Sequence, residues 1–434
     1  MMVLSAAFGI ASITRVHQRT CCSNGISHNR RTNQSPFRLK PINNNVIGDD
    51  SSQTVHPSVA EAGLLQLVQS HFVAQTLLAV VRLGVPDVLD STRAMVVDEI
   101  IAHLENPHSI NRDALFRCLR LLCTTGVIRE TTVSFEGSLQ VAFLLTDMGK
   151  LLQTSHSESM ASFVLHWMEA PLWNAWSHLS DYLAGNQVDS TFDGVAIPPF
   201  NTANGVMASE YYSNNENSKL HRNAVARYAS SREIPAILDA IRSNISPHIN
   251  ESILSGKTIV DVGGGYGNLL VELKECIKTV GACYCLDLPD VIQDTKVVTA
   301  TDAVKFVQGN MFDHETIPAC DVIFTKHVLC DFSDEDVVRA LESFHRVLCP
   351  SGKLVIMDAV LPNGENLNGN WNAAVSFDVL LMLSGRRGER SSLEWCNLAH
   401  EAGFVLEEVV STSSVTVDLA IFQKWDNFSA QAIV

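Results

Sequence analysis

The stretch VDVGGGYGN, residues 260–268, decides the fold of this chain. It joins an apolar strand, KTIVDV, to an amphipathic helix, NLLVELKECIKTV, through a turn that contains Gly263, Gly265 and Gly267. Glycines at a strand-to-helix turn let backbone amides approach a ligand that side chains would exclude. Asn268 stands where a dinucleotide-binding turn needs a small residue, so the spacing indicates a nucleoside with a sulfonium tail instead.

Strands and helices alternate after this turn. The strand-like segments are ACYCLD, KFVQG, DVIFTKHV and KLVIMDAVL, the helical ones include DEDVVRALESFHRVL and SSLEWCNLAHEAG, and two strands close the chain. This alternation predicts an α/β domain over residues 251–434, with a mostly parallel sheet and helices on both faces. Ligands of such sheets lie at the carboxyl ends of the strands, and the polar clusters of this chain fall there.

Two further strand ends suit a nucleoside. Asp287 ends the second strand, where a carboxylate can accept both ribose hydroxyls; the alternative is a turn residue before Pro289. Asn310 and Met311 end the third strand and suit the edge and face of an adenine ring; the alternative is an ordinary turn.

The N-terminal half is predicted to be helical. Three helices and two strand-like segments give the outline of a winged helix over residues 56–160, and helices continue through residues 161–250 as a connecting region. Winged helices often bind DNA, and Arg112, Arg117 and Arg120 of the third helix could face a groove. The surrounding chain is acidic, which favours a structural or dimerising use.

Composition excludes some partners. A net charge of -16 over 434 residues argues against nucleic acid, and we recognise no apolar stretch long enough to span a bilayer, so no membrane partner is expected. The 11 cysteines lie in apolar segments without zinc-type Cys-x-x-Cys pairs. We therefore expect reduced thiols and no metal ion.

Residues 1–55 have a different composition. They are rich in Ser, Thr and Asn, and the first acidic residue is Asp49. This bias is typical of an organellar transit peptide, and a disordered tail fits equally well. The predicted location is cytoplasmic, or a plastid or mitochondrion if this segment is a transit peptide.

Five segments occur together in a fixed order: VDVGGGYGN, DLPDVI, GNMFD, TKHVLCDFSDED and GRRGERSSLEWCNLAHEAGF. Together they resemble the S-adenosylmethionine-dependent O-methyltransferases of the caffeate, flavonoid and acetylserotonin type. The resemblance implies a Rossmann-like catalytic domain with a mostly parallel seven-stranded sheet, and an N-terminal, mainly helical, winged-helix-like dimerisation domain. It also implies a homodimer, S-adenosylmethionine as co-substrate and a small-molecule acceptor. The predicted cofactor-binding residues are Gly263, Gly265, Asp287, Leu288, Asn310, Met311 and Lys326.

The main difference from the family is the residue at the position of the proton acceptor. The family's His-Asp-Trp-Ser-Asp motif aligns with residues 330–335, so that Cys330 stands at the position of the base. Cys330 could be the base, although a thiol with a pKa of about 8.5 is mostly protonated at pH 7, and Asp331 would raise that pKa. His327 could replace it, although an odd offset on a strand reverses the face. The third interpretation, slightly favoured, is an acceptor that needs no strong base.

The resemblance also implies two flanking acids, Asp378 and Glu394. From the residues alone, Asp378 could be a solvated helix position, and Glu394 completes a capping box with Ser391. The predicted function is methyl transfer from S-adenosylmethionine to a small molecule, most simply at a hydroxyl oxygen. Methyl transfer to nitrogen, sulfur or carbon and a noncatalytic S-adenosylmethionine-binding regulator are the alternatives. The candidate catalytic residues are Cys330, Asp378, Glu394 and His327.

Overall fold

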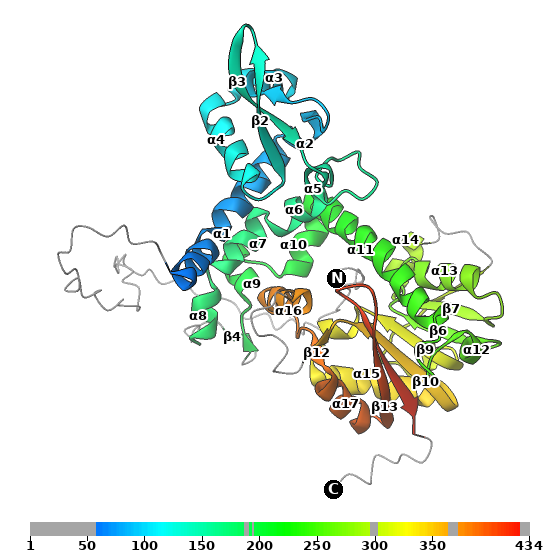
Figure 1. The fold of residues 1–434 in the computed structure, drawn as a ribbon. Coiled ribbons are helices and arrows are strands. Elements are labelled where there is room, and N and C mark those ends of the chain that lie inside the picture. The colour runs from blue at the N-terminus through cyan, green and yellow to red at the C-terminus, as the bar shows by residue number, and fades with distance from the viewer. Residues whose placement is uncertain (1–57, 186–190, 193–194, 296–302, 363–371, 426–434) are drawn as a thin grey trace, which may run out of the picture. The chain divides into compact units, whose positions relative to one another are not determined.

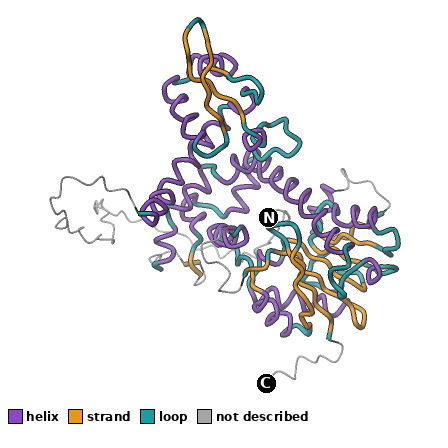
Figure 2. Tube along the Cα trace, in the orientation of Figure 1, coloured by secondary structure: helices purple, strands orange, loops and turns teal. Residues whose placement is uncertain are grey.

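The protein is described from a computed structural model that covers residues 58–185, 191–192, 195–295, 303–362 and 372–425 (Figure 1). Residues 1–55 lie outside the part of the chain that the structure describes, so their targeting role stays a prediction. Helices dominate the N-terminal part of the chain, and most strands belong to the C-terminal part (Figure 2).

The N-terminal part has the outline of a winged helix. Strands β2 and β3 form an antiparallel hairpin and β1 pairs with β3, which gives the sheet order β1-β3-β2. The Asn111 side chain caps α4 by accepting a hydrogen bond from Ala114 N at 3.0 Å, and α4 buries Leu115, Leu119 and Leu122 on one face. The elements are α1 (Val59–Arg82), α2 (Val85–Val88), β1 (Met95–Val96), α3 (Val97–His103), α4 (Arg112–Cys123), β2 (Ile128–Phe135), β3 (Ser138–Leu145) and α5 (Asp147–Lys150).

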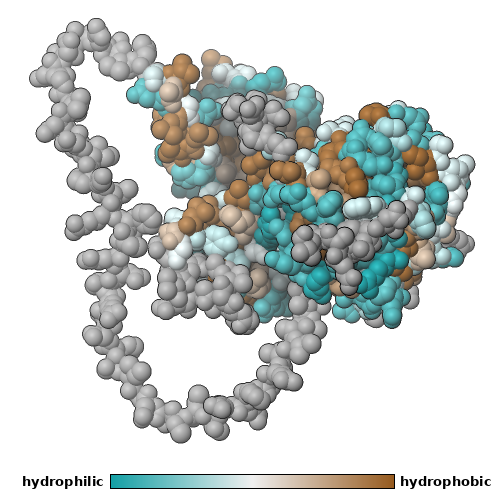
Figure 3. Space-filling view, turned by 90° about the horizontal axis from the view of Figure 1, so that it is seen from below, coloured by the Kyte–Doolittle hydropathy of each residue, from teal (hydrophilic) through white to brown (hydrophobic). Residues whose placement is uncertain are grey.

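Helix α1 leaves large apolar side chains open to solvent. Leu64, Leu67 and Val68 are 64%, 72% and 58% exposed. Its 24 residues are long and apolar enough to cross a membrane, which corrects the expectation that no segment reaches that length. One such helix is weak evidence of a membrane span. Apolar surface is also visible among hydrophilic side chains on the face drawn in Figure 3. Exposed apolar surface of this kind marks an interaction site.

Helices fill most of residues 161–254, and one helix from later in the chain joins them. Leu172, Phe200 and Tyr212 pack in one cluster with Leu380 and Leu383 of α16 (Ala373–Leu383). The C-terminal half of the sequence therefore contributes a helix to the connecting region. The other elements here are α6 (Ala161–Trp167), α7 (Ala170–Trp176), α8 (Leu179–Leu183), β4 (Thr191–Phe192), β5 (Val195–Ala196), α9 (Pro199–Asn204), α10 (Ala208–Asn214), α11 (Glu216–Arg242) and α12 (Glu251–Leu254).

The C-terminal part contains the predicted seven-stranded sheet, in the order β13-β14-β10-β9-β6-β7-β8. Strands β10, β9, β6, β7 and β8 are parallel, and β14 is antiparallel to both of its neighbours. The elements are β6 (Ile259–Val262), α13 (Asn268–Cys276), β7 (Cys283–Asp287), α14 (Pro289–Thr295), β8 (Lys305–Gln308), η2 (His314–Thr316), β9 (Cys320–Lys326), η3 (Leu329–Asp331), α15 (Asp334–Val347), β10 (Leu348–Asp358), β11 (Val360–Leu361), β12 (Arg390–Ser391), α17 (Ser392–Glu401), β13 (Phe404–Ser411) and β14 (Asp418–Lys424).

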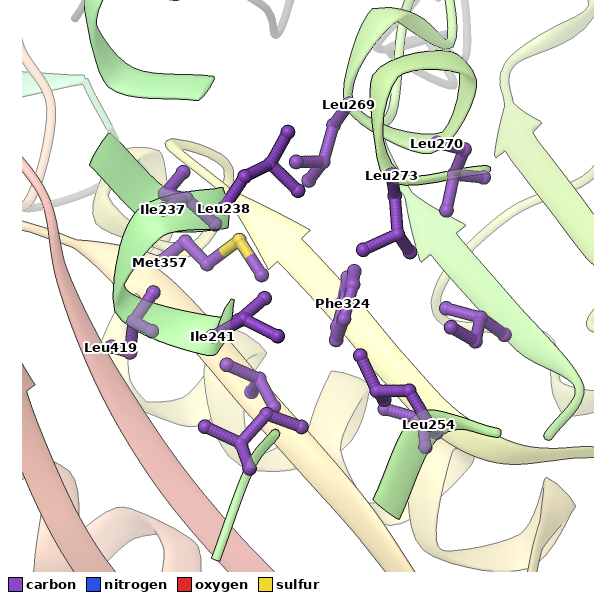
Figure 4. Close-up of a cluster of buried hydrophobic side chains, with 14 of the residues drawn as sticks. Ile237, Leu238, Ile241, Leu254, Leu269, Leu270, Leu273, Phe324, Met357 and Leu419 are labelled. Carbon is purple, nitrogen blue, oxygen red and sulfur yellow. The ribbon is translucent and has the colours of Figure 1, made fainter. Parts of the chain in front are cut away.

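Apolar layers cover both faces of this sheet. Ile241 of α11 and Leu273 of α13 pack in one layer with Phe324 of β9 (Figure 4). Phe344 of α15 and Trp395 of α17 belong to the layer on the other face. With both faces buried, the carboxyl ends of the parallel strands are the edge on which polar side chains can meet a ligand.

Candidate active site

Asp287 is fixed at the tip of β7 by the backbone around it. Its Oδ2 accepts a hydrogen bond from Gly265 N at 3.0 Å, and its Oδ1 accepts one from Leu288 N at 2.8 Å. Burial raises the pKa of Asp287, and the two backbone donors partly offset that rise. A carboxylate oxygen has more than one acceptor direction, so both oxygens can still accept from a pair of hydroxyls.

The glycine turn packs closely against the rest of the site. Gly263 has φ +73°, and a Cβ there would lie 2.5 Å from Val328 Cγ2. A Cβ on Gly264 would lie 2.6 Å from Asp261 Oδ2. A side chain at either position would displace neighbouring groups. Close packing within the protein therefore requires these glycines, in addition to any need for room around a ligand.

The end of β8 lies beside the end of β7, because Gln308 pairs with Asp287 in register. Asn310 is exposed, and its side-chain oxygen accepts a hydrogen bond from Phe312 N at 3.0 Å. Met311 is buried in the apolar layer that contains Val262. The structure therefore brings the predicted residues of three strand ends to one edge, while their contacts with adenine stay predictions.

A buried carboxylate from α11 binds the end of β9. Glu233 Oε2 accepts a hydrogen bond from Lys326 Nζ at 2.9 Å, and its Oε1 lies 3.0 Å from His327 Nε2 and 2.8 Å from Thr416 Oγ1. Burial opposes the charge on Glu233, but His327 and Lys326 hold the pKa of this carboxyl well below its usual value. No motif in the sequence indicated Glu233, because it lies on helix α11, far in the chain from the strand-end motifs.

The ring of His327 is held inside this cluster. The residue has φ +53° and is 3% exposed, and burial lowers the pKa of its imidazole. Its backbone N–H donates to Asp358 Oδ1 at 2.7 Å. These contacts give His327 a structural role at the end of β9, and its role as a replacement base stays a prediction.

Cys330 lies in the turn η3 with a carboxylate from each of two other segments. The ligand-type atoms of Cys330, Asp358 and Glu389 all lie within 4.8 Å of one another, and the three residues are buried. Asp358 ends β10, the strand next to β9, and Glu389 precedes β12. The structure thus places Asp358 and Glu389, which the sequence analysis did not name, beside position 330, and the catalytic roles expected of Asp378 and Glu394 stay predictions.

Asp378 and Glu394 support the backbone around this cluster. Asp378 Oδ1 accepts a hydrogen bond from Glu389 N at 2.9 Å. Glu394 caps α17 through Ser391, as the residues alone predicted, and its other oxygen accepts from Arg387 at 2.9 Å. Both oxygens of Glu394 thus have partners, which confirms the capping box and leaves its catalytic role a prediction.

The surroundings of Cys330 keep its thiol protonated. Burial raises the pKa of Cys330 well above its usual value, and the carboxyls of Glu389, Asp358 and Asp331 add to that rise. Burial also raises the pKa of Asp358 to about 6 and that of Glu389 well above its usual value. Without a cation, Cys330 is a neutral thiol at neutral pH and is a poor proton acceptor.

The segment that carries Glu389 is bound to the turn that carries Cys330. Gly388 N donates to Cys330 O at 3.0 Å. The fully buried Arg390 donates to Leu329 O at 3.0 Å and to Phe332 O at 2.8 Å. These backbone contacts fix the relative positions of the thiol and the carboxyl.

Two solved methyltransferases share this fold. Human N-acetylserotonin methyltransferase, in complex with SAM, has a TM-score of 0.66 at 18% identity over 86% of this chain and 99% of that chain. CalO1, a methyltransferase of calicheamicin biosynthesis in an SAH-bound form, has a TM-score of 0.66 at 23% identity over 84% of this chain and 97% of that chain. The fold is thus the Rossmann-like methyltransferase fold with an N-terminal helical region.

Family comparisons are more specific. An O-methyltransferase domain matches residues 176–405, and an O-methyltransferase dimerisation domain matches residues 65–155. The chain belongs to the O-methyltransferase family, as the sequence predicted, and is an S-adenosylmethionine-dependent enzyme. A probable O-methyltransferase 3 of Humulus lupulus is 26% identical over 84% of this chain and 93% of its own length. Nicotinate N-methyltransferase 1 of Oryza sativa subsp. japonica is 28% identical over 82% of this chain and 95% of its own length.

The Glu233 cluster predicts a large effect on stability. Glu233→Gln removes the charge that neutralises the buried Lys326, so we expect the free energy of unfolding to fall by about 3 kcal/mol. Chemical denaturation measures this change. The matched control is Asp98→Asn, which breaks an exposed ion pair with Arg112 and should cost less than about 1 kcal/mol. Equal losses in the two variants would contradict the importance of the buried cluster.

Asp261, under the glycine turn, predicts a pH dependence. Burial raises the pKa of Asp261 to about 7, well above its value in an unfolded chain. Between pH about 4 and pH 7 the folded protein therefore binds the extra proton, and raising the pH lowers the free energy of unfolding. In Asp261→Asn this fall in the free energy of unfolding with rising pH should be smaller by up to about 4 kcal/mol. One pKa unit is worth about 1.4 kcal/mol. Denaturant unfolding of both proteins across this range tests it, and parallel pH profiles would contradict it.

Proposed function

We propose that the glycine turn and Asp287 hold the adenosyl group of S-adenosylmethionine, and that a hydroxyl of the small-molecule acceptor lies against Cys330, Asp358 and Glu389. The observation that carries this proposal is the Asp287 carboxylate, which two backbone donors hold rigid at the tip of β7. Carboxylates at this strand end bind ribose hydroxyls in nucleoside sites. The protein orients the two substrates, and the sulfonium methyl group of the co-substrate supplies the reactivity.

The reaction needs a route for one proton. The acceptor oxygen forms a bond to the methyl carbon while the carbon–sulfur bond breaks and leaves a neutral thioether. The hydroxyl proton must leave the acceptor. In the absence of a metal ion, Asp358 and Glu389 are the described groups beside Cys330 that can accept it, because the thiol is protonated.

The acceptor is expected to meet the helical region that precedes the sheet. The ring of Phe377 on α16 lies 5.1 Å from that of Trp167, and α16 ends just before the segment that carries Glu389. This apolar wall suits a planar acceptor. A nitrogen acceptor is the second candidate, because buried carboxylates can stabilise the positive charge that a neutral nitrogen gains as it takes the methyl group, and one relative is named as an N-methyltransferase.

The first test is co-substrate binding. Asp287→Ala should weaken S-adenosylmethionine binding, measured by calorimetry, by about 100-fold, since charge-assisted hydrogen bonds contribute about 1.5–3 kcal/mol. Asp290→Ala, an exposed position on the following helix, is the control and should bind normally. Transfer of a labelled methyl group across phenols, amines and thiols then names the acceptor class. Binding of NAD in place of S-adenosylmethionine would contradict the proposal.

We also propose that the protein is a homodimer that associates through its N-terminal region. The support is the match of residues 65–155 to a dimerisation domain and the exposed apolar side chains of α1. Large exposed apolar surfaces on soluble proteins mark such contacts.

A paired substitution tests the dimer. Leu64→Asp with Leu67→Asp places two charges on the exposed face of α1 and should halve the mass measured by light scattering. Leu393→Asp alters a side chain that is 64% exposed on α17 and should leave the mass unchanged. A wild-type protein with the mass of a single chain would contradict the dimer.

A further inference from the structure

We propose that Cys330, Asp358 and Glu389 bind a divalent transition-metal ion, with Zn²⁺ the best fit, next to the acceptor. The sequence predicted no metal because no spacing of ligand residues suggests one. The fold assembles the three ligands from segments that are far apart in the chain: the turn after β9, the end of β10 and the segment before β12. The metal's role in catalysis rests on the function proposed above, whereas its binding does not.

The distances suit a small ion. One ligand atom from each residue lies within 4.8 Å of the other two. In a tetrahedral zinc site, Zn–S is about 2.3 Å and Zn–O about 2.0–2.2 Å, which places ligand atoms about 3.3–3.7 Å apart. A contraction of about 1 Å, within the reach of side-chain rotation, would close the site around the metal.

Two buried carboxyl oxygens have no partner. Asp358 Oδ2 and Glu389 Oε2 lack a hydrogen bond among the described residues, and their side chains belong to residues only 1% and 5% exposed. Burying such groups is costly unless protons or a cation compensate them. Within the described part of the chain, the cationic side chains that act on Cys330 and Asp358 have acidic partners of their own, which are Asp331 for Arg386, Asp334 for Arg390 and Glu233 for Lys326.

The ligands are also held in place by surrounding contacts. Asp358 Oδ1 accepts from His327 N at 2.7 Å, which leaves its other oxygen for the ion. Glu389 is held through its backbone N–H by Asp378 at 2.9 Å, and Cys330 through its carbonyl by Gly388 at 3.0 Å. Outer contacts of this kind orient metal ligands and raise metal affinity.

The ligand set selects the type of metal. A thiolate with two carboxylates favours Zn²⁺, Co²⁺ or Fe²⁺ over Mg²⁺, which prefers oxygen ligands alone. Three protein ligands leave one tetrahedral position open, as in catalytic zinc sites. A metal held by these three residues would act as a Lewis acid there and would lower the pKa of an acceptor hydroxyl, so that its proton could be lost to water. Such a site would remove the need for an imidazole base.

The test measures the metal without relying on activity. The full-length protein is stripped with a chelator and titrated with Co²⁺, and we expect one equivalent to give the near-ultraviolet charge-transfer band of a Co²⁺–thiolate bond. Cys330→Ser should abolish the band, and Cys396→Ser, which alters a half-buried cysteine on α17, should keep it. Glu389→Gln and Asp358→Asn should each weaken Zn²⁺ binding at least about 10-fold.

The outcomes separate this inference from the proposed function. Absence of the band in the wild-type protein, or its persistence in Cys330→Ser, overturns the metal site. If S-adenosylmethionine still binds in that case, the proposed function stands, and protons or a cationic acceptor balance the buried carboxyls. If the band forms but S-adenosylmethionine does not bind, the metal site stands and the proposed function fails. Mg²⁺ added in excess should not displace Co²⁺; displacement would indicate an oxygen-only site and contradict the thiolate ligand.

Discussion

The site depends on the interaction that ends β9, in which the Glu233 carboxylate binds both Lys326 and His327 inside the protein. A helix of the connecting region thereby determines where a strand of the sheet stops. His327 can then adopt φ +53°, a conformation that non-glycine residues rarely hold unless their surroundings enforce it. The chain leaves the strand direction there, which places Val328 against Gly263 and turns Cys330 toward Asp358. One buried ion pair thus positions part of the cofactor turn and part of the acceptor cluster.

Acidic side chains gather along this edge of the sheet. Asp261, Asp287, Asp358 and Glu389 are all buried near the carboxyl ends of the parallel strands, and burial raises the pKa of each. Desolvated carboxylates are unfavourable alone and favourable beside a cation. A sulfonium co-substrate carries such a charge before methyl transfer and loses it afterwards. An acidic edge therefore favours binding of the methyl donor and weaker binding of the neutral thioether product.

Local sequence was sufficient for the parts of this site that are local in the chain. The glycine turn, the acid that ends the next strand and the order of strands and helices follow from spacing and alternation, and the seven-stranded sheet confirms them. Asp358 could have been found by the same strand-end rule, because β10 lies beside β9 and its last residue follows the pair Met357 and Lys326. Glu389 and Glu233 could not, since tertiary packing alone brings them to the edge. Glu394 shows a fully local case: its capping box with Ser391 was predictable from four residues, and the structure confirms it.

Cysteine at position 330 changes the charge of the cluster as well as its basicity. A histidine there could become a cation on accepting a proton, and two neighbouring carboxylates would stabilise that cation. A neutral thiol offers no such compensation, so at least one of Asp358 and Glu389 must remain protonated unless a positive charge is brought from outside. The protein has kept both acids buried and has fixed their backbone with Arg390, Gly388 and Asp378 rather than exposing them to water. Because rigid buried acids can neither relax into solvent nor pair with one another as anions, the ligand that completes this site has to supply the missing cation or the missing protons.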